Sequence, residues 1–82
     1  MKKKIVILGS TGSIGKNTIK IIKKDKNNFD IKLLSTNKNI TEVVRQAKEF
    51  KVKDIIINNH HKFIEAKKKY KNFKINFHNS FS

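Results

Sequence analysis

Short apolar runs alternate along the chain with segments whose apolar residues recur every three to four positions. The runs span residues 4–8, 29–36, 52–57 and 73–77, and they predict strands, because buried parallel strands are short and nearly continuously apolar. The segments 13–24, 40–50 and 61–70 carry the spacing of one helical face. The resulting βαβαβαβ order is typical of an α/β, Rossmann-like parallel sheet of a doubly wound domain.

The same pattern predicts which side chains face the core and how the elements begin. Thr41 is expected to cap the second helix, and His60-His61 to open the third. Right-handed crossovers should place the helices on the faces of the sheet, with the first or fourth strand left as an unpaired edge. The inward residues predicted for the three helices are Ile14, Thr18, Ile21 and Ile22; Ile40, Val43, Val44, Ala47 and Phe50; and Phe63, Ile64, Ala66 and Tyr70.

The size and composition allow one small domain, residues 1–82. The chain has no cysteine, which excludes disulfides and thiolate metal sites. The longest apolar stretch, Ile5–Leu8, is far shorter than the ~20 residues that cross a bilayer. It is also too short for a signal peptide, although lysines precede it. We therefore expect an intracellular protein without a membrane partner, located in the cytoplasm, or in the stroma of a plastid-type organelle if the source is eukaryotic.

The net charge of +14 suggests a polyanionic partner such as nucleic acid. However, 19 of the 20 cationic residues are lysine, and Lys, Asn and Ile together supply 42 of the 82 residues. A/T-rich codons encode this trio, so genome composition alone explains it. Nucleic-acid readers also favour arginine forks and stacking aromatic residues, and the aromatic residues here are scattered. We therefore interpret the lysines as a solvated surface, with a nucleic-acid-binding module as the alternative.

One segment predicts a ligand site: Gly9-Ser10-Thr11-Gly12-Ser13-Ile14-Gly15. It contains all three glycines of the chain and lies between the first strand and the first helix, where backbone N–H groups can bind a pyrophosphate. Gly9 would allow the tight turn, Gly12 the approach of a phosphate, and Gly15 close helix–strand packing. The spacing is G-x-x-G-x-x-G, and no Gly-Lys-Ser/Thr of a P-loop follows it. The segment predicts dinucleotide binding, although a βα turn without a ligand would also use glycine.

A second site segment lies at the end of the second strand. NAD-binding folds place an Asp or Glu about 20 residues beyond the glycine loop to bind the ribose 2′-hydroxyl. The equivalent stretch here, Ser35-Thr36-Asn37-Lys38-Asn39, contains no acid. Hydroxyls, amides and an ammonium would accept a 2′-phosphate, so the stretch favours NADP over NAD, and an ordinary polar turn is the alternative.

The stretch Ile7–Gly15 resembles the opening of 1-deoxy-D-xylulose 5-phosphate reductoisomerases. Asn37-Lys38-Asn39-Ile40 is similar to the Gly-Lys-Asn-Val turn of that family, and Ala47–Phe50 to the end of the following helix. The resemblance extends from Lys4 to about Ile57 and fades towards Phe77. One departure is Asn37, where the family has glycine; asparagine tolerates a left-handed backbone, which would preserve the turn.

The resemblance implies an NADPH-binding segment of an enzyme that converts 1-deoxy-D-xylulose 5-phosphate to 2-C-methyl-D-erythritol 4-phosphate in non-mevalonate isoprenoid synthesis. It also implies Mg²⁺ or Mn²⁺, a sugar-phosphate substrate and a homodimer for the full-length enzyme. By this resemblance the cofactor contacts are Gly9, Ser10, Thr11, Gly12, Ser13, Ile14 and Gly15 in the loop and Asn37, Lys38 and Asn39 in the turn.

Neither a catalytic residue nor a metal ligand of that reaction can be assigned in this chain. Its six acids are dispersed, and His60, His61 and His78 lack the spacing of metal ligands. We therefore expect a truncated, inactive part of the NADPH-binding domain, without the catalytic and C-terminal domains. An alternative is the N-terminal piece of another Rossmann NADP-dependent reductase, which would share only part of the glycine loop.

Overall fold

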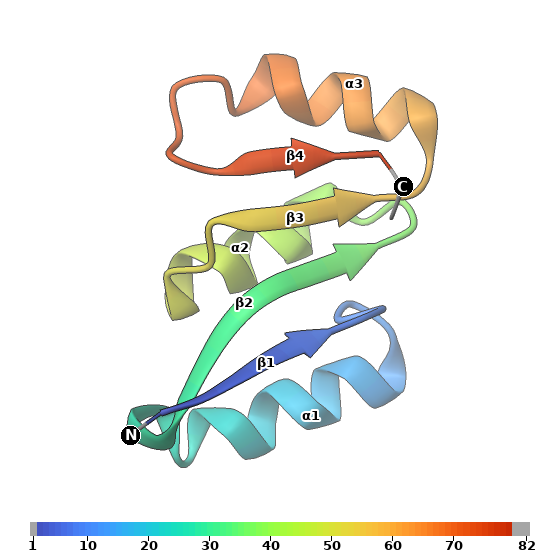
Figure 1. Cartoon of the computed structure of the whole chain (residues 1–82). Helices are drawn as coiled ribbons and strands as arrows, with labels where there is room; N and C mark the ends of the chain where they lie inside the picture. Colours follow the sequence, from blue (N-terminus) through green and yellow to red (C-terminus); the bar gives the residue numbers. More distant parts are fainter. Residues whose placement is uncertain (1, 80–82) are drawn as a thin grey trace.

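A computed structural model describes residues 2–79 as one parallel sheet with connecting helices (Figure 1). The strands pair in the order β1-β2-β3-β4, which confirms the predicted βαβαβαβ fold and leaves β1 and β4 as edges. The elements in chain order are β1 (Lys3–Ile7), α1 (Ser13–Lys23), the 3₁₀ turn η1 (Lys26–Asn28), β2 (Phe29–Thr36), α2 (Ile40–Phe50), β3 (Asp54–Ile57), α3 (His60–Lys69) and β4 (Asn76–His78).

All three helices pack on one face of the sheet. Each strand pairs with the next one in the chain, so successive right-handed crossovers advance in one direction and return to the same side. Figure 1 shows α2 behind β2 and β3, with α1 and α3 towards the two edges. No helix covers the opposite face among residues 2–79, and Val6 is 54% exposed there. Ile56 also lies on that face; it is buried but is not part of the core cluster.

The core joins one face of every helix to alternate strand residues. The side chains of a strand alternate between faces, and a register shift between β1 and β2 lets Ile31 and Leu34, three positions apart, share the helix-covered face. The cluster consists of Ile7, Ile19, Ile22, Ile31, Leu34, Ile40, Val43, Val44, Ala47, Val52, Ile55, Ile57 and Ala66. The inward face predicted for α2 is confirmed, with Phe50 half-buried against the cluster.

The inward face predicted for α1 is correct at Ile22 and wrong at Ile14 and Ile21. The structure buries Gly15, Ile19 and Ile22, whereas Ile14 is 84% and Ile21 68% exposed. A Cβ atom at Gly15 would collide with the Gly9 carbonyl oxygen, so this position must lie against the loop backbone. That contact fixes the rotation of the helix, and positions 15, 19 and 22 then share the buried face.

Some predicted element ends also differ. Asn39, not Thr41, caps α2: its Oδ1 accepts a hydrogen bond from the Glu42 amide at 3.2 Å. The helix begins at Ile40, and a cap immediately precedes its helix. The last strand is shorter than predicted, because Phe73 closes the turn after α3 by donating its amide to the Tyr70 carbonyl. In α3, which does begin at His60, Ala66 is buried but Ile64 is exposed.

Candidate functional site

The two segments predicted to bind a cofactor lie together at the carboxyl edge of the sheet. The glycine loop follows β1, and the turn 37–39 follows β2, which is the neighbouring parallel strand. Ile7, the last residue of β1, pairs with Leu34 near the end of β2, so the two strands end close to each other at this edge of the sheet. Ligands of open α/β sheets bind outside this edge, where loops and helix N-termini meet.

Two of the three loop glycines are required by the fold itself. Gly9 has a φ of +64°, the left-handed region that side chains other than glycine rarely adopt. A Cβ at Gly15 would lie 2.6 Å from the Ser10 Cα. Gly15 therefore allows α1 to pack against the backbone of the glycine loop. The sequence pattern instead predicts that Gly15 allows packing of the helix against the strand.

Gly12 differs, because the fold leaves room for a side chain there. Its φ of −78° is ordinary, and an added Cβ would meet only the Gly9 carbonyl oxygen, at 3.5 Å. Gly12 is also the N-cap of α1, where Ser or Asn would stabilise the helix, and no side chain caps this helix. The first backbone N–H groups of a helix lack intrahelical acceptors. The open space beside Gly12 and the free N–H donors at the start of α1 suit an anion. Room for an anion therefore explains the glycine at this position, which packing alone does not require.

The glycine loop is held against the end of β2 by hydrogen bonds. The Gly9 amide donates to Ser35 Oγ at 2.8 Å, and the Ser10 amide donates to the Ser35 carbonyl at 2.9 Å. The hydroxyl oxygens of Thr11 and Thr36 lie 2.7 Å apart. Because these bonds connect residues about 25 positions apart, the loop has a fixed place relative to β2.

These contacts use both hydroxyls of the stretch that precedes the 2′-phosphate turn. Ser35 and Thr36 are 3% and 2% exposed, and their hydroxyls bind the loop, so neither is free for a ligand. The Asn39 side chain is used as the helix cap. Asn37 and Lys38 remain exposed in the turn. The left-handed backbone that Asn37 would tolerate is not adopted there, because Lys51 is the only non-glycine residue with positive φ among residues 2–79.

Gln46 is a further residue at this edge, and the sequence analysis missed it. It is fully buried on α2, and its Nε2 donates to the Ser10 carbonyl at 3.0 Å and to Glu42 Oε2 at 3.1 Å. Two acceptors fix the orientation of the amide, which leaves Oε1 buried without a partner among the described residues. The available signal was a polar residue among the apolar positions of α2.

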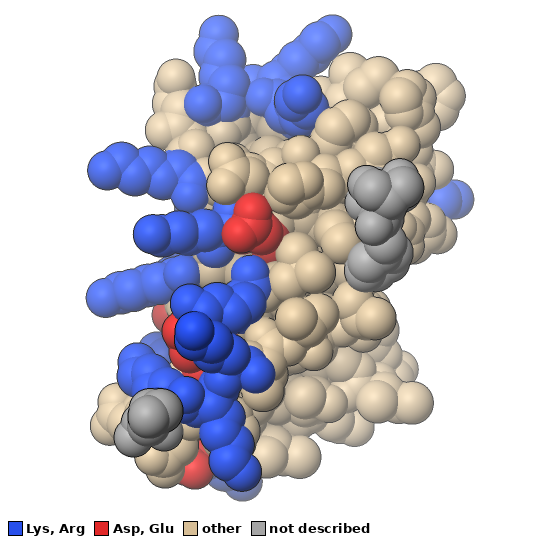
Figure 2. Space-filling view, viewed as in Figure 1, with Lys and Arg blue, Asp and Glu red and all other residues tan. Residues whose placement is uncertain are grey.

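Two charged side chains near the site, Glu42 and Arg45, form an ion pair with each other. Arg45 binds Glu42 through Nε at 3.0 Å, and this hydrogen bond is the main cause that lowers the pKa of Glu42. Glu42 is the acid closest in sequence to the turn, and the positive charge of Arg45 balances its carboxylate. In Figure 2 lysines gather on the left of the view, at the amino ends of the strands, whereas few lie at the carboxyl edge on the right. The high net charge is therefore not concentrated beside the glycine loop on this face.

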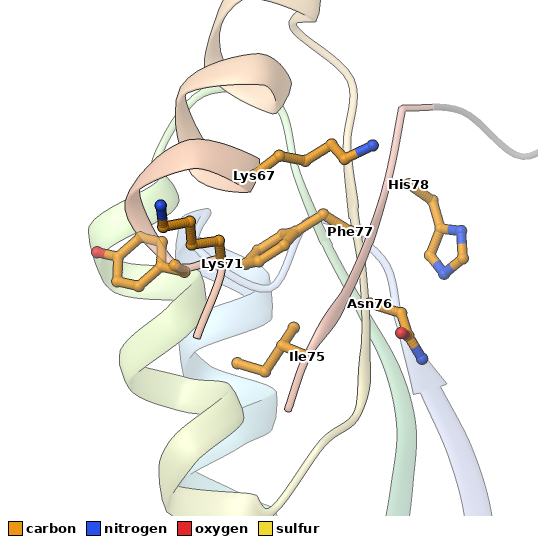
Figure 3. A pocket seen from close by; sticks show the side chains of 7 residues that line it. Lys67, Lys71, Ile75, Asn76, Phe77 and His78 are labelled. Atoms are coloured by element: carbon orange, nitrogen blue, oxygen red, sulfur yellow. The ribbon is translucent and has the colours of Figure 1, made fainter. Parts of the chain in front are cut away.

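A hollow of about 460 Å³ lies elsewhere, between α3 and the edge strand β4 (Figure 3). Ile75 and Phe77 point into it, whereas Asn76 and His78 point to the other side of the strand. His78 instead contacts Asp54 at 3.1 Å on the neighbouring strand. Within residues 2–79, no three His, Asp or Glu side chains are grouped to hold a metal ion, and no helix is long and apolar enough to cross a membrane.

Comparison with known proteins identifies the family of the chain. Residues 5–81 match the family of 1-deoxy-D-xylulose 5-phosphate reductoisomerases. The chain belongs to this family. It is 47% identical over 79 residues to the reductoisomerase of Pelagibacter ubique, and the match covers 96% of this chain and 20% of that protein. The apicoplastic enzyme of Plasmodium falciparum is 40% identical over 73 residues, which cover 85% of this chain and 15% of that protein.

Solved reductoisomerases share the fold. The Zymomonas mobilis enzyme in complex with NADPH superposes with a TM-score of 0.87 at 22% identity, over 95% of this chain and 21% of that one. A second reductoisomerase, in complex with magnesium, gives a TM-score of 0.80 at 24% identity, over 95% of this chain and 19% of the other. The sequence thus spans about a fifth of the length of these reductoisomerases.

Proposed function

We propose that residues 1–82 are the NADPH-binding part of a reductoisomerase that converts 1-deoxy-D-xylulose 5-phosphate to 2-C-methyl-D-erythritol 4-phosphate. Family membership supports the activity of the whole enzyme. The observation that carries NADPH binding is the juxtaposition, on neighbouring strands, of the uncapped start of α1 behind Gly12 and an acid-free turn with exposed Lys38.

In this proposal the loop and the turn bind opposite ends of the phosphorylated adenosine moiety. The amides at the start of α1, beginning at Ser13 and Ile14, face the pyrophosphate, where the helix dipole favours negative charge. The Lys38 ammonium and the Asn37 amide bind the 2′-phosphate. When bound, NADPH supplies the hydride for reduction; the residues of this chain bind and orient it. A divalent metal ion and the sugar phosphate belong to the proposal for the full-length enzyme only.

The wider setting of this function is also part of the proposal. A homodimer is proposed for the full-length enzyme, in the cytoplasm or in the stroma of a plastid-type organelle. We propose that the partner of this segment is NADPH rather than a membrane or a nucleic acid. The placement of most visible lysines at the amino ends of the strands, away from the glycine loop, supports a solvated role for them.

Cofactor preference tests the proposal directly. NADPH should bind the chain more tightly than NADH, because a charge-assisted hydrogen bond contributes roughly 1.5–3 kcal/mol. Lys38→Glu should erase or reverse this preference, which calorimetric titration of both nucleotides would measure. Lys53→Glu is the matched control: it makes the same change of charge at the amino end of β3 and should keep the preference.

Two outcomes would contradict the assignment. Equal affinity of the unmodified chain for NADPH and NADH would refute the 2′-phosphate site. Single-stranded DNA titrated at low and high salt separates the alternative function: tight binding of DNA without binding of NADPH would favour a nucleic-acid-binding module, whose affinity should fall steeply with salt.

A further inference from the structure

The end of β2 connects the two halves of the proposed cofactor site through two adjacent buried hydroxyls. Apart from its pairing with Ile56 in the sheet, Ser35 makes its hydrogen bonds to the glycine loop: its Oγ accepts from the Gly9 amide, and its carbonyl accepts from the Ser10 amide and, at 3.4 Å, from Ser10 Oγ. Because side chains alternate along a strand, Thr36 points to the other face of the sheet. The two neighbours therefore contact different groups.

Thr36 contacts both the loop and the turn. Its Oγ1 lies 2.7 Å from Thr11 Oγ1 and accepts a hydrogen bond from the Asn39 amide at 3.3 Å. A hydroxyl has one proton and two lone pairs, so it can make both bonds at once. Thr36 is 2% exposed, and the loss of its hydroxyl would leave the Asn39 amide without this acceptor. No other side chain of the described residues hydrogen-bonds both segments.

The turn that Thr36 holds is the one that carries Lys38. Its backbone is further tied to the loop after β3, because the Asn59 amide donates to the Asn37 carbonyl at 2.9 Å. The Asn39 side chain in turn caps α2. A displacement of Asn39 would therefore move the preceding Lys38 relative to the glycine loop, and it would change the distance between the two phosphate subsites.

We propose that Ser35 and Thr36 are positioning residues with different tasks. Ser35 fixes the glycine loop, and the Thr36 hydroxyl couples that loop to the turn with Lys38, which sets the separation of the pyrophosphate and 2′-phosphate subsites. This inference rests on the proposed NADPH site and assigns it two residues that do not touch the nucleotide. The affinity for NADPH should depend on both residues, whereas the ratio of NADPH to NADH affinity should depend on Thr36.

The test compares Ser35→Ala, Thr36→Val and Thr36→Ser by calorimetric titration with NADPH and NADH. Ser35→Ala should lower both affinities about tenfold and keep their ratio, because a lost buried hydrogen bond costs about 1–3 kcal/mol. Thr36→Val should also lower the ratio of NADPH to NADH affinity, by about fivefold or more by the same reasoning. Thr36→Ser keeps the hydroxyl and should restore the ratio. Thr18→Val, which removes a hydroxyl bonded only within α1, is the control.

The ratio is the measurement that a merely structural role would not change. An unchanged ratio in Thr36→Val, or an equal loss of ratio in Ser35→Ala, would overturn the division of tasks. If the unmodified chain binds neither nucleotide, the proposed function fails, and amide hydrogen exchange tests the positioning by itself. Thr36→Val should then accelerate exchange at Asn39, and Ser35→Ala should accelerate it at Gly9. Unchanged exchange in both variants, with native circular dichroism, would refute the positioning roles.

Discussion

Gly12 is a residue whose identity the fold does not require, and this makes it a sharp probe of the site. Gly12→Ala places a Cβ at ordinary contact distance from the Gly9 carbonyl oxygen and at an ordinary φ. We expect stability to be kept or slightly raised, because glycine costs backbone entropy on folding. Binding of NADPH should fall at least tenfold, because the Cβ would fill the space where a phosphate approaches. Thermal melting and titration would measure the two effects.

Gly15→Ala is the matched control for this prediction. Its Cβ would lie within 2.6 Å of the Ser10 Cα, so the variant should lose both stability and binding. A Gly12→Ala variant that loses helical circular dichroism together with binding would show that Gly12 has a structural role only. The larger Gly12→Val should abolish binding while the fold stays mostly intact.

At this scale the sequence predicts residues with local signatures better than residues that depend on tertiary contacts. The glycine loop was visible because three glycines occur within seven residues and nowhere else. The tasks of Ser35, Thr36 and Gln46 were not visible, because their partners lie about 25 to 36 positions away. The sequence counted the hydroxyls of Ser35 and Thr36 among groups that accept a phosphate, because a hydroxyl in a sequence does not reveal which groups it already binds.

At the scale of elements, α1 and α2 are joined by a network of charged groups on their solvent side. Glu49 on α2 binds Lys23 on α1 at 2.9 Å and Arg45 at 3.3 Å, and Arg45 also binds Glu42. The Lys23 hydrogen bond is the main cause that lowers the pKa of Glu49. This network supports the packing of a helix whose rotation the sequence pattern predicted incorrectly.

The lowered pKa values of Glu42 and Glu49 predict sensitivity to acid. A carboxylate whose folded pKa lies below its unfolded value of 4.5 stabilises the fold above that pH, and this contribution is lost as the pH falls through the folded pKa. Melting temperature should therefore decrease below about pH 4.5. Glu49→Gln should make this decrease smaller and cost less than about 1 kcal/mol at pH 7, because the pair is partly exposed and screened.

Glu65→Gln serves as the control, since its partner Lys62 is on the same helix and the carboxylate is half exposed. Its melting temperature should follow the unmodified chain across the pH range. An acid transition of Glu49→Gln as steep as that of the unmodified chain would contradict the network as its source.

Element order was more predictable than helix rotation or capping, for a physical reason. Apolar periodicity reports burial averaged over an element, and it located the four strands and three α-helices of the described residues but not the 3₁₀ turn η1. The rotation of α1 instead follows from one backbone contact at Gly15, which outweighs the exposure of Ile14 and Ile21. The apolar side chains on the outer side of this helix explain why periodicity alone misplaced its buried face.

At the scale of the whole molecule, the described residues form a sheet covered on one side only. Val6 and Leu8 are 54% and 58% exposed, and each exposed Å² of apolar surface forgoes about 25 cal/mol of burial. Both edge strands lack an outer partner within residues 2–79. The charge of +14 adds self-repulsion to a fold of this small size.

The 82-residue chain by itself should therefore be marginally stable and catalytically inert. Complete domains are stable by only ~5–15 kcal/mol, so the exposed apolar face and the charge repulsion should give a broad melt at low temperature. Added salt should raise the melting temperature, because it screens repulsion between lysines. No oxidation of NADPH is expected with 1-deoxy-D-xylulose 5-phosphate and Mg²⁺ or Mn²⁺, since the 82 residues correspond to only about a fifth of the related reductoisomerases. Measurable turnover by the purified chain would contradict this reading, because it would require a catalytic site among residues that the fold keeps apart.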